Sequence, residues 1–341
     1  MSPAELAQSP LARPFKLSQQ PLATLMWQVI VALSPGILLT AILFGIGVLV
    51  QLVLALTTVM LVDYIIGIFQ AGEITSTIKD GTAAVLAIIV AISLPPYCPW
   101  WITVASAAVA TGLGKHLYGG TGQNLFNPAM VGIVFALVCF PAISTYWPTI
   151  SSASDMTVRE SLALIFGQRH HDIDAISGAT LLEFERTQHL LAVMRSEFSD
   201  AGLYGVIAER GWEWVNMTYL FGGIFLCLRR VIKPTVPIWF LGVFFIVTAT
   251  AHGFDSTRFA GPFVHLFSGA TIVCAFFIAT DPVSSPTGHL ATIIYASLLA
   301  LSVFLFRHFS AYPDGVAFSI ILLNALVPLL DRLLPKQIYG H

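Results

Sequence analysis

The chain is dominated by long apolar runs, and this feature constrains its fold more than any other. A helix needs about 20 predominantly apolar residues to cross the hydrocarbon core of a bilayer. Ten segments of the 341-residue chain approach that length with few charges: residues 22–41, 44–70, 80–96, 98–114, 126–143, 216–231, 236–252, 262–281, 288–306 and 314–331. The sequence therefore predicts an all-α integral membrane protein with about ten transmembrane helices, several of them short or broken by Pro35, Pro128 or Pro328.

Charge is scarce in this chain. Charged residues make up 10% and hydrophobic residues 56%, whereas a soluble domain carries about 25% charged residues. This composition excludes a disordered protein, a nucleic-acid binder with a basic face, and almost any water-soluble enzyme of this size. The formal net charge of -2 provides no strong field for an acidic partner. The lipid bilayer is therefore the first expected partner.

The cysteines indicate neither a disulfide framework nor a metal cluster. The chain has four of them, Cys98, Cys139, Cys227 and Cys274, and none belongs to a CxxC or CxxxC pair. Cysteine in an apolar run behaves as a small hydrophobe. No metal site formed by this chain alone is therefore expected.

One stretch, residues 144–215, differs from the rest. It contains 10 of the 18 acidic residues and 5 of the 16 basic residues, and no run in it could cross a bilayer. It is predicted to be a soluble insertion between two five-helix membrane halves, residues 22–143 and 216–331, with short tails at 1–21 and 332–341. An odd number of helices per half would orient the halves oppositely, as in inverted-repeat transporters.

The basic residues of the short connections predict the orientation. One side collects nine of them: Arg13, Lys16, Lys79, Lys115, Arg229, Arg230, Lys233, Arg332 and Lys336. The other side has only Arg258 and Arg307. The positive-inside rule then places both termini in the cytoplasm. In a bacterium, the chain would lie in the inner membrane with the insertion in the periplasm, entering the membrane through its own first helix because no signal peptide precedes it.

The insertion contains the heptapeptide Asp-Ala-Ile-Ser-Gly-Ala-Thr at 174–180. Small residues (Ser177, Gly178 and Ala179) flank the Thr180 hydroxyl and leave it accessible to a second protein. No neighbouring group in the sequence would make Thr180 a nucleophile, so modification by another enzyme is favoured over catalysis. Residues 268–271 repeat the tetrapeptide Ser-Gly-Ala-Thr within an apolar run, where close helix packing explains it. Asp174 and the soluble setting distinguish the first copy.

Three segments together resemble one known family. The 174–180 motif, with Asp174, Ser177, Gly178 and Ala179 leading to Thr180, is similar to the flavinylation motif of two related membrane proteins, RnfD of the Rnf ferredoxin:NAD oxidoreductase complex and NqrB of the sodium-pumping NADH:quinone oxidoreductase. Residues 119–129 and 275–286 are similar to the family's Gly-Gly-x-Gly-x-Asn-x-x-Asn-Pro-Ala and Phe-Phe-x-Ala-Thr-Asp-Pro segments. The short amino-terminal tail fits the Rnf member best.

The resemblance implies cofactors and partners. In this family a flavin transferase links FMN through its phosphate to the last Thr of the motif, here Thr180. Asn124 and Asn127 match asparagines that lie at a non-covalent riboflavin, and amides suit the polar edge of a flavin ring. Capping of the following helix by Asn127 is the simpler alternative and is compatible with this role. The chain would act with other membrane and peripheral subunits and be catalytically silent alone.

Several other residues have two interpretations. Asp63, inside an apolar run, predicts an ion path or a structural hydrogen bond to a neighbouring Ser, Thr or Tyr. Asp281 predicts an ion path or simple solvation near a cytoplasmic mouth. Packing is favoured over a redox relay for Phe276 and Phe277. Surface anchoring is favoured over flavin contact for Lys115 and His116, and helix capping for Asp80 and Asp314.

The favoured function is a flavin-carrying membrane subunit that relays electrons and couples them to movement of H+ or Na+. The alternative is a solute channel or transporter without redox chemistry, which broken helices and two opposed halves also permit. A passive scaffold for other subunits is the third candidate. No GxGxxG segment follows a strand, so no nicotinamide site is expected in this chain.

Overall fold

The computed structural model describes residues 20–69, 80–144, 146–150, 156–167, 177–191, 203–312 and 314–334. Helices of the first half are α2 (Leu22–Phe44), α3 (Gly47–Phe69), α5 (Thr82–Ser93), α6 (Trp100–Val109), the π-helix η2 (Ala110–His116), α7 (Pro128–Cys139) and α8 (Pro141–Ser144). Those of the second half are α13 (Trp212–Leu228), α14 (Thr235–Phe254), α15 (Pro262–Phe267), α16 (Thr271–Val273), the π-helix η4 (Cys274–Ile278), α17 (His289–Phe309) and α18 (Val316–Leu333).

Each of the ten predicted apolar ranges contains a helix, but the helices differ greatly in length. Within the described residues, five are long and apolar enough to cross a membrane: α2, α3, α14, α17 and α18. The apolar helices α5 and α7 have only 12 residues each. Large apolar side chains are exposed on the long helices, including Ile42, Val53 and Ile246, at 67%, 60% and 63%. Such outward apolar faces are typical of helices that contact lipid.

Two expectations about proline are wrong. Pro35 lies inside α2 and Pro328 inside α18, and both helices continue through these positions. Membrane helices tolerate an internal proline where neighbouring groups compensate the lost backbone hydrogen bond. Pro128 instead stands at the first position of α7, where its missing N–H costs nothing.

The prediction of one continuous helix at 262–281 is also wrong, because the chain there forms three short helical segments. It divides into α15, α16 and η4, and the break falls at Ser268, Gly269 and Ala270. Gly269 has a φ of +65°, a conformation that favours glycine. The second Ser-Gly-Ala-Thr copy therefore interrupts a helix, and its Thr271 hydroxyl donates to the carbonyl of His265 at 2.9 Å.

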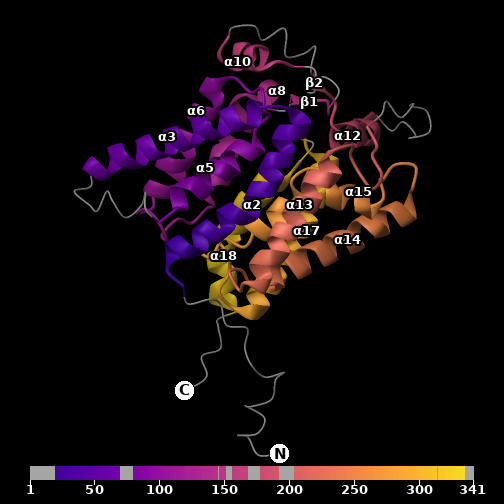
Figure 1. Ribbon diagram of the computed structural model, residues 1–341. Coiled ribbons are helices and arrows are strands. Elements are labelled where there is room, and N and C mark those ends of the chain that lie inside the picture. Colours follow the sequence, from indigo (N-terminus) through magenta and orange to yellow (C-terminus); the bar gives the residue numbers. More distant parts are fainter. Residues whose placement is uncertain are drawn as a thin grey trace, which may run out of the picture.

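The fold is predominantly helical, as predicted, and the described part of the insertion adds one short sheet. The insertion contains α10 (Val158–Phe166), α12 (Leu181–Leu191) and a two-stranded antiparallel sheet of β1 (Trp147–Pro148) with β2 (Ser177–Gly178). Thr157 and Glu160 form a capping box at the start of α10, and these hydrogen bonds lower the pKa of Glu160. Figure 1 shows α10, β1, β2 and α12 together at one end of the bundle, called the insertion end below.

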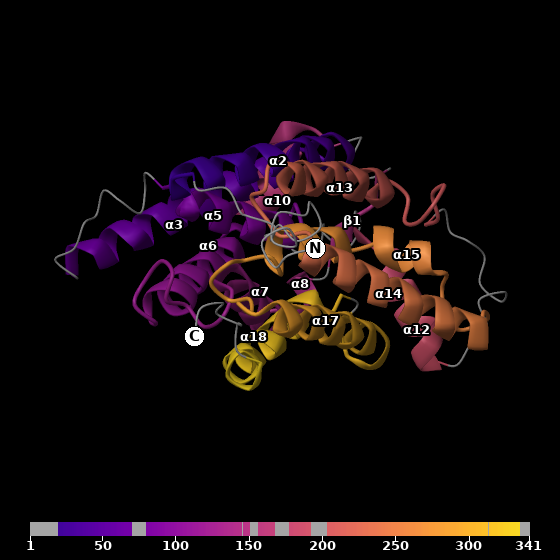
Figure 2. The same cartoon turned by 90° about the horizontal axis from the view of Figure 1, so that it is seen from below.

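The two halves pack against each other through matching helices. The first helix of each half, α2 and α13, lie side by side, as do α7 and α18, which correspond to the last apolar range predicted in each half. Figure 2 shows α13 beside α2 on one side of the bundle and α18 near α7 on the other. The core residues Leu33, Val59 and Leu299 are fully buried within this arrangement. The broken helix lies in the interior, where it contacts α13 and α14.

Candidate functional site

Thr180 is the N-terminal cap of α12. Its Oγ1 accepts a hydrogen bond from the backbone N–H of Glu183 at 3.2 Å. Its carbonyl accepts another from the N–H of Phe184 at 2.9 Å. The polar side chain at the end of the motif therefore satisfies one of the free N–H groups with which every helix begins.

The rest of the motif leads into this cap. Ser177 and Gly178 form β2, which pairs with Pro148 and Trp147 of β1, and Ala179 is exposed. Asp174 lies outside the described residues. The short sheet therefore fixes the backbone immediately before Thr180.

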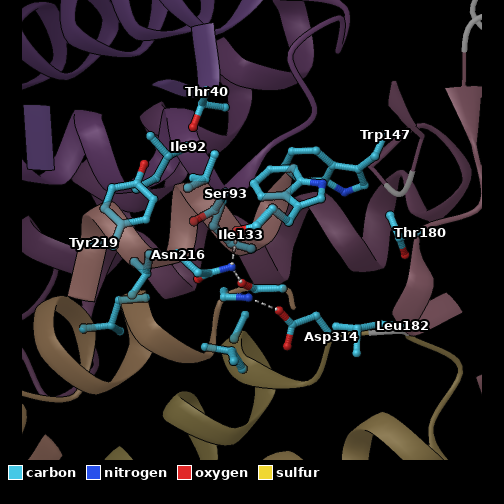
Figure 3. Close-up of a pocket in the computed structure, with 18 of the residues that line it drawn as sticks. Thr40, Ile92, Ser93, Ile133, Trp147, Thr180, Leu182, Asn216, Tyr219 and Asp314 are labelled. Carbon is cyan, nitrogen blue, oxygen red and sulfur yellow. Dashed lines mark hydrogen bonds between the residues drawn. The ribbon is translucent and has the colours of Figure 1, made fainter. Parts of the chain in front are cut away.

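A cavity of about 150 Å³ adjoins Thr180 at the insertion end, and we call it the Thr180 cavity. Its lining includes the aromatic residues Trp147, Trp212, Tyr219 and Tyr312. The rings of Trp147 and Trp212 meet edge to face, with centroids 5.1 Å apart. Figure 3 shows Thr180 near Trp147, on the side of the cavity opposite Tyr219. Aromatic walls around a reachable hydroxyl suit a planar group attached to that hydroxyl.

The broken helix closes the other side of the Thr180 cavity. Gly269 and Ala270 line the cavity, and Asn216 of α13 donates to the carbonyls of Phe267 and Gly269 at 2.9 and 3.2 Å. Asp314 accepts from the N–H of Ala270 at 2.7 Å. Figure 3 shows the Asn216 and Asp314 contacts with the break.

Arg307 clamps the same break from α17. Its guanidinium donates to the carbonyl of His265 and to the hydroxyl of Thr271, both at 2.7 Å, and pairs with Asp314 at 3.2 Å. Arg307 is 3% exposed, so the ion pair satisfies a charge that water does not reach. The expectation that Asp314 only caps α18 is therefore wrong. Asp80 does act at its helix start, accepting from the N–H of Thr82 at 2.9 Å.

Glu209 is a buried acid in the wall of the Thr180 cavity that sequence reasoning missed. It accepts a hydrogen bond from the N–H of Leu181, directly after Thr180, and its own N–H donates to Ser268 Oγ at 3.3 Å. Burial raises its pKa to about 8, and the nearby carboxylate of Asp314 adds to the rise. Because charge in the insertion looks like ordinary solubility, no local pattern in the sequence marks this residue.

A larger cavity, of about 480 Å³, lies on the side of the Thr180 cavity away from the insertion end, and we call it the Asn124 cavity. Asn124 and Asn127 both line it. The Asn124 amide donates to the carbonyl of Phe126 at 3.0 Å, and Asn127 Oδ1 accepts from the N–H of Met130 at 3.3 Å. The helix-capping role considered for Asn127 is therefore confirmed, and Asn127 also lines the cavity.

The segment around Asp281 forms another wall of the Asn124 cavity. Asp281 accepts from Ser284 Oγ at 2.8 Å and from the N–H of Val283 at 3.2 Å. Phe276 and Phe277 are each 6% exposed and line the same cavity. The structure thus brings five residues singled out in the sequence to one cavity: Asn124, Asn127, Asp281, Phe276 and Phe277.

Asp63 lies beside this cavity in a buried charge cluster. Its carboxylate contacts Lys115 Nζ at 2.9 Å and His116 Nε2 at 2.6 Å. The side chains of Asp63 and Lys115 are 1% and 4% exposed. The surface-anchor interpretation of Lys115 and His116 is therefore wrong. The partners of Asp63 are these two basic residues rather than a hydroxyl, and Lys115 also lines the Asn124 cavity.

The two cavities are close neighbours in the helix bundle. Residues of α2, α5, α13 and η4 line both of them. Ile278 faces the Thr180 cavity, whereas its neighbour Phe277 faces the Asn124 cavity. The same alternation separates Met130 from Ala129. Different sides of the same helical turn therefore face the two cavities at these places.

Comparison with known proteins agrees with the motifs. The model of the NQR2, RnfD, RnfE family matches residues 11–340. A protein of Tolumonas auensis, named as the D-type subunit of an ion-translocating oxidoreductase complex, is 38% identical over 336 residues, covering 95% of this chain and 97% of that protein. Proteins of the same name from Yersinia pseudotuberculosis and Aeromonas hydrophila are 38% and 37% identical, each covering 96% of this chain and 97% of their own length. The resemblance read from the motifs is confirmed, and the chain belongs to the NQR2, RnfD, RnfE family.

Proposed function

We propose that this chain is the flavin-carrying membrane subunit of a redox-driven, ion-translocating complex. The observation that carries the proposal is the position of the motif residues at two adjoining cavities, Thr180 at one and Asn124 with Asn127 at the other. The names of the relatives support membership of an ion-translocating oxidoreductase complex, with further subunits supplying the other cofactors. The proposed location is a bacterial inner membrane, crossed about ten times, with the insertion outside and both termini inside.

The surroundings of Thr180 fit FMN attached through its phosphate. The N-terminus of α12 favours an anion at Thr180 Oγ1, because free N–H groups and the helix dipole both point there. A pKa of about 8 keeps Glu209 largely uncharged at neutral pH, which reduces repulsion of a phosphate. Trp147 and Trp212 supply aromatic surface for the ring. The cavity is small for a flavin, but a covalent bond makes full enclosure unnecessary.

The Asn124 cavity fits non-covalent riboflavin. Its volume of about 480 Å³ falls within the range of about 300–1,000 Å³ typical of small-molecule sites. Phe276 and Phe277 provide apolar walls, and Asn124 and Asn127 provide amides for the polar edge of the ring. Lys115 adds a positive charge in the lining. When bound, both flavins would supply one- and two-electron transfer, and the protein would set their spacing and environment.

Ion movement requires groups that respond to the charge of the cofactors. We assign this role to Asp63 and Asp281, because the first pairs with a cavity-lining lysine and the second lines that cavity directly. Both are acids within or at the end of apolar helices, where a charge is costly unless it is paired or functional. The conducted ion, H+ or Na+, would pass by the Asn124 cavity.

A denaturing gel viewed under ultraviolet light tests the covalent flavin. Protein made together with its flavin transferase should give a fluorescent band at the mass of this chain. Thr180→Ala should abolish the band, whereas Thr271→Ala, in the second Ser-Gly-Ala-Thr copy, should keep it. A band that survives Thr180→Ala would show that Thr180 is not the attachment site.

The broken helix at Ser268–Ala270 favours a second candidate, a solute channel or transporter without redox chemistry. Interrupted helices form substrate sites in many transporters because they expose backbone groups to a cavity. This candidate predicts a dark gel and no flavin in the denatured extract. The same experiment therefore separates the two functions.

A further inference from the structure

Asn324 of α18 connects the two loops that form the polar wall of the Asn124 cavity. Its side chain is fully buried. The surroundings orient the amide so that Oδ1 accepts from the backbone N–H of Asn127 at 2.8 Å. Its Nδ2 lies 3.2 Å from the carbonyl of Ser284 and 3.1 Å from the hydroxyl of Tyr295.

These contacts join segments from both halves of the molecule. Asn127 begins α7 in the first half, and Ser284 belongs to the loop after η4 in the second half. Ser284 also donates to Asp281, so the link from Asn324 continues to the cavity-lining acid. A side chain needs both a donor and an acceptor to hydrogen-bond a backbone N–H and a backbone carbonyl at the same time. The amide of Asn324 provides both.

We propose that Asn324 is a positioning residue for the flavin of the Asn124 cavity, holding Asn127 and the Asp281–Ser284 loop at the separation that the ring requires. This inference rests on the proposed function of that cavity. Asn324 does not line the cavity itself, so it acts through its two backbone partners. Loss of the link would leave a buried N–H and a buried carbonyl unpaired and let the walls shift.

The chain offers a matched control at the other cavity. Asn216 is 1% exposed on α13 and its amide likewise donates to backbone carbonyls of a loop, at the break beside the Thr180 cavity. The Asn324→Leu and Asn216→Leu substitutions therefore remove the same group from equally buried positions. Their effects should differ in which flavin they disturb.

The experiment measures covalent flavin by gel fluorescence and riboflavin by extraction and by titration of purified, flavin-transferase-treated protein. Asn324→Leu should weaken riboflavin binding about tenfold or more while keeping the covalent flavin. Asn216→Leu should keep riboflavin binding unchanged. Asn324→Asp retains the acceptor for Asn127 but places an oxygen, in place of the donor, against the Ser284 carbonyl, so it should also weaken binding. It serves as the second variant if the leucine variant does not accumulate. Tyr295→Phe leaves both loops linked and should bind normally.

The outcomes separate this inference from the function on which it rests. Riboflavin affinity within twofold of wild type in both Asn324 variants would overturn the role of Asn324. Equal loss in the Asn324 and Asn216 variants would also overturn it, because general destabilisation would then explain the result. Wild-type protein that takes up no riboflavin would overturn the second cofactor and this inference together. A dark gel with normal riboflavin binding would remove only the covalent flavin.

Discussion

Two clusters of buried charge in this protein each bring opposite charges together. Asp63 meets Lys115 and His116, and Arg307 meets Asp314, in each case with contacts of 3.2 Å or less. A charge taken out of water is stabilised only by a partner in good geometry. The hydrogen bonds given above for the buried acid Glu209 involve no basic group, and its pKa rises instead. These residues therefore make sharp tests of the electrostatics at the two cavities.

Lys115→Met should be strongly destabilising. It leaves the Asp63 carboxylate with only His116, and breaking a buried pair costs about 3–5 kcal/mol. The double variant Asp63→Asn with Lys115→Met removes both charges and should recover most of that loss. Thermal melts of the detergent-purified variants measure both effects. A single variant as stable as wild type would show that the pair does not contribute to folding.

Glu209 should make stability depend on pH. Its pKa is about 8 in the folded protein, against an ordinary value of 4.5, so the folded state binds the extra proton between these values. The contribution of Glu209 to stability is then most favourable below about pH 4.5 and is lost through the window up to pH 8, by at most about 1.4 kcal/mol per pH unit. Glu209→Gln should flatten this part of the profile of melting temperature against pH. Glu160 is exposed and its pKa is lowered in the folded protein, so Glu160→Gln should leave the fall in melting temperature between pH 4.5 and 8 in place.

At the scale of elements, the same four-residue sequence occurs twice in the chain and adopts two different structures. Ser-Gly-Ala-Thr at 177–180 is a strand leading to a helix cap, whereas at 268–271 it breaks a helix. Partners decide the difference. The first copy pairs with β1, and Asn216, Arg307 and Asp314 hold the second. A local sequence therefore acquires its conformation from the elements packed around it.

Gly269→Ala tests this break. Gly269 has a positive φ, and a Cβ there would lie 2.6 Å from Leu182 Cδ1 and 2.7 Å from Asp314 Oδ2. We expect a loss of about 1–3 kcal/mol, from backbone strain and from displacement of α12. Gly242→Ala in α14, where no heavy atom lies within 4 Å of the added carbon, should be neutral or slightly stabilising. Melting temperatures of the two variants provide the comparison, and equal values would contradict the strain argument.

At the scale of the whole molecule, both halves contribute lining residues to each cavity. The Thr180 cavity takes residues from the insertion and from both halves, including Ile133, Tyr219 and Val316. The Asn124 cavity combines the glycine-rich loop of one half with the Asp281 loop of the other. The pairings of α2 with α13 and of α7 with α18 are those that a two-fold relation between the halves would produce. The inverted repeat stays a prediction that superposition of the halves can test.

The predicted orientation can be tested with cysteine labelling. Arg159→Cys places a thiol on the exposed face of α10 in the insertion, and Arg229→Cys places one at the opposite end of α13. In a background with Cys139→Ser, a membrane-impermeant maleimide added to spheroplasts should label the first and not the second. Lysis should expose the second. The reverse pattern would place the insertion in the cytoplasm and overturn the orientation.

The sequence by itself determined the composition-driven features of this protein. Apolar runs show where helices form, because a helix in lipid satisfies its backbone internally and needs only length and hydrophobicity. The charge-rich insertion and the three family motifs could likewise be identified from the sequence, since each is local in the chain. Tertiary structure decided what depends on contacts between distant segments. It paired Asp63 with Lys115, broke the helix at Gly269, and brought Asn324 to Asn127 and Ser284. Buried polar groups need partners, and these partners of Asp63 and Asn324 lie tens to hundreds of residues away in the chain.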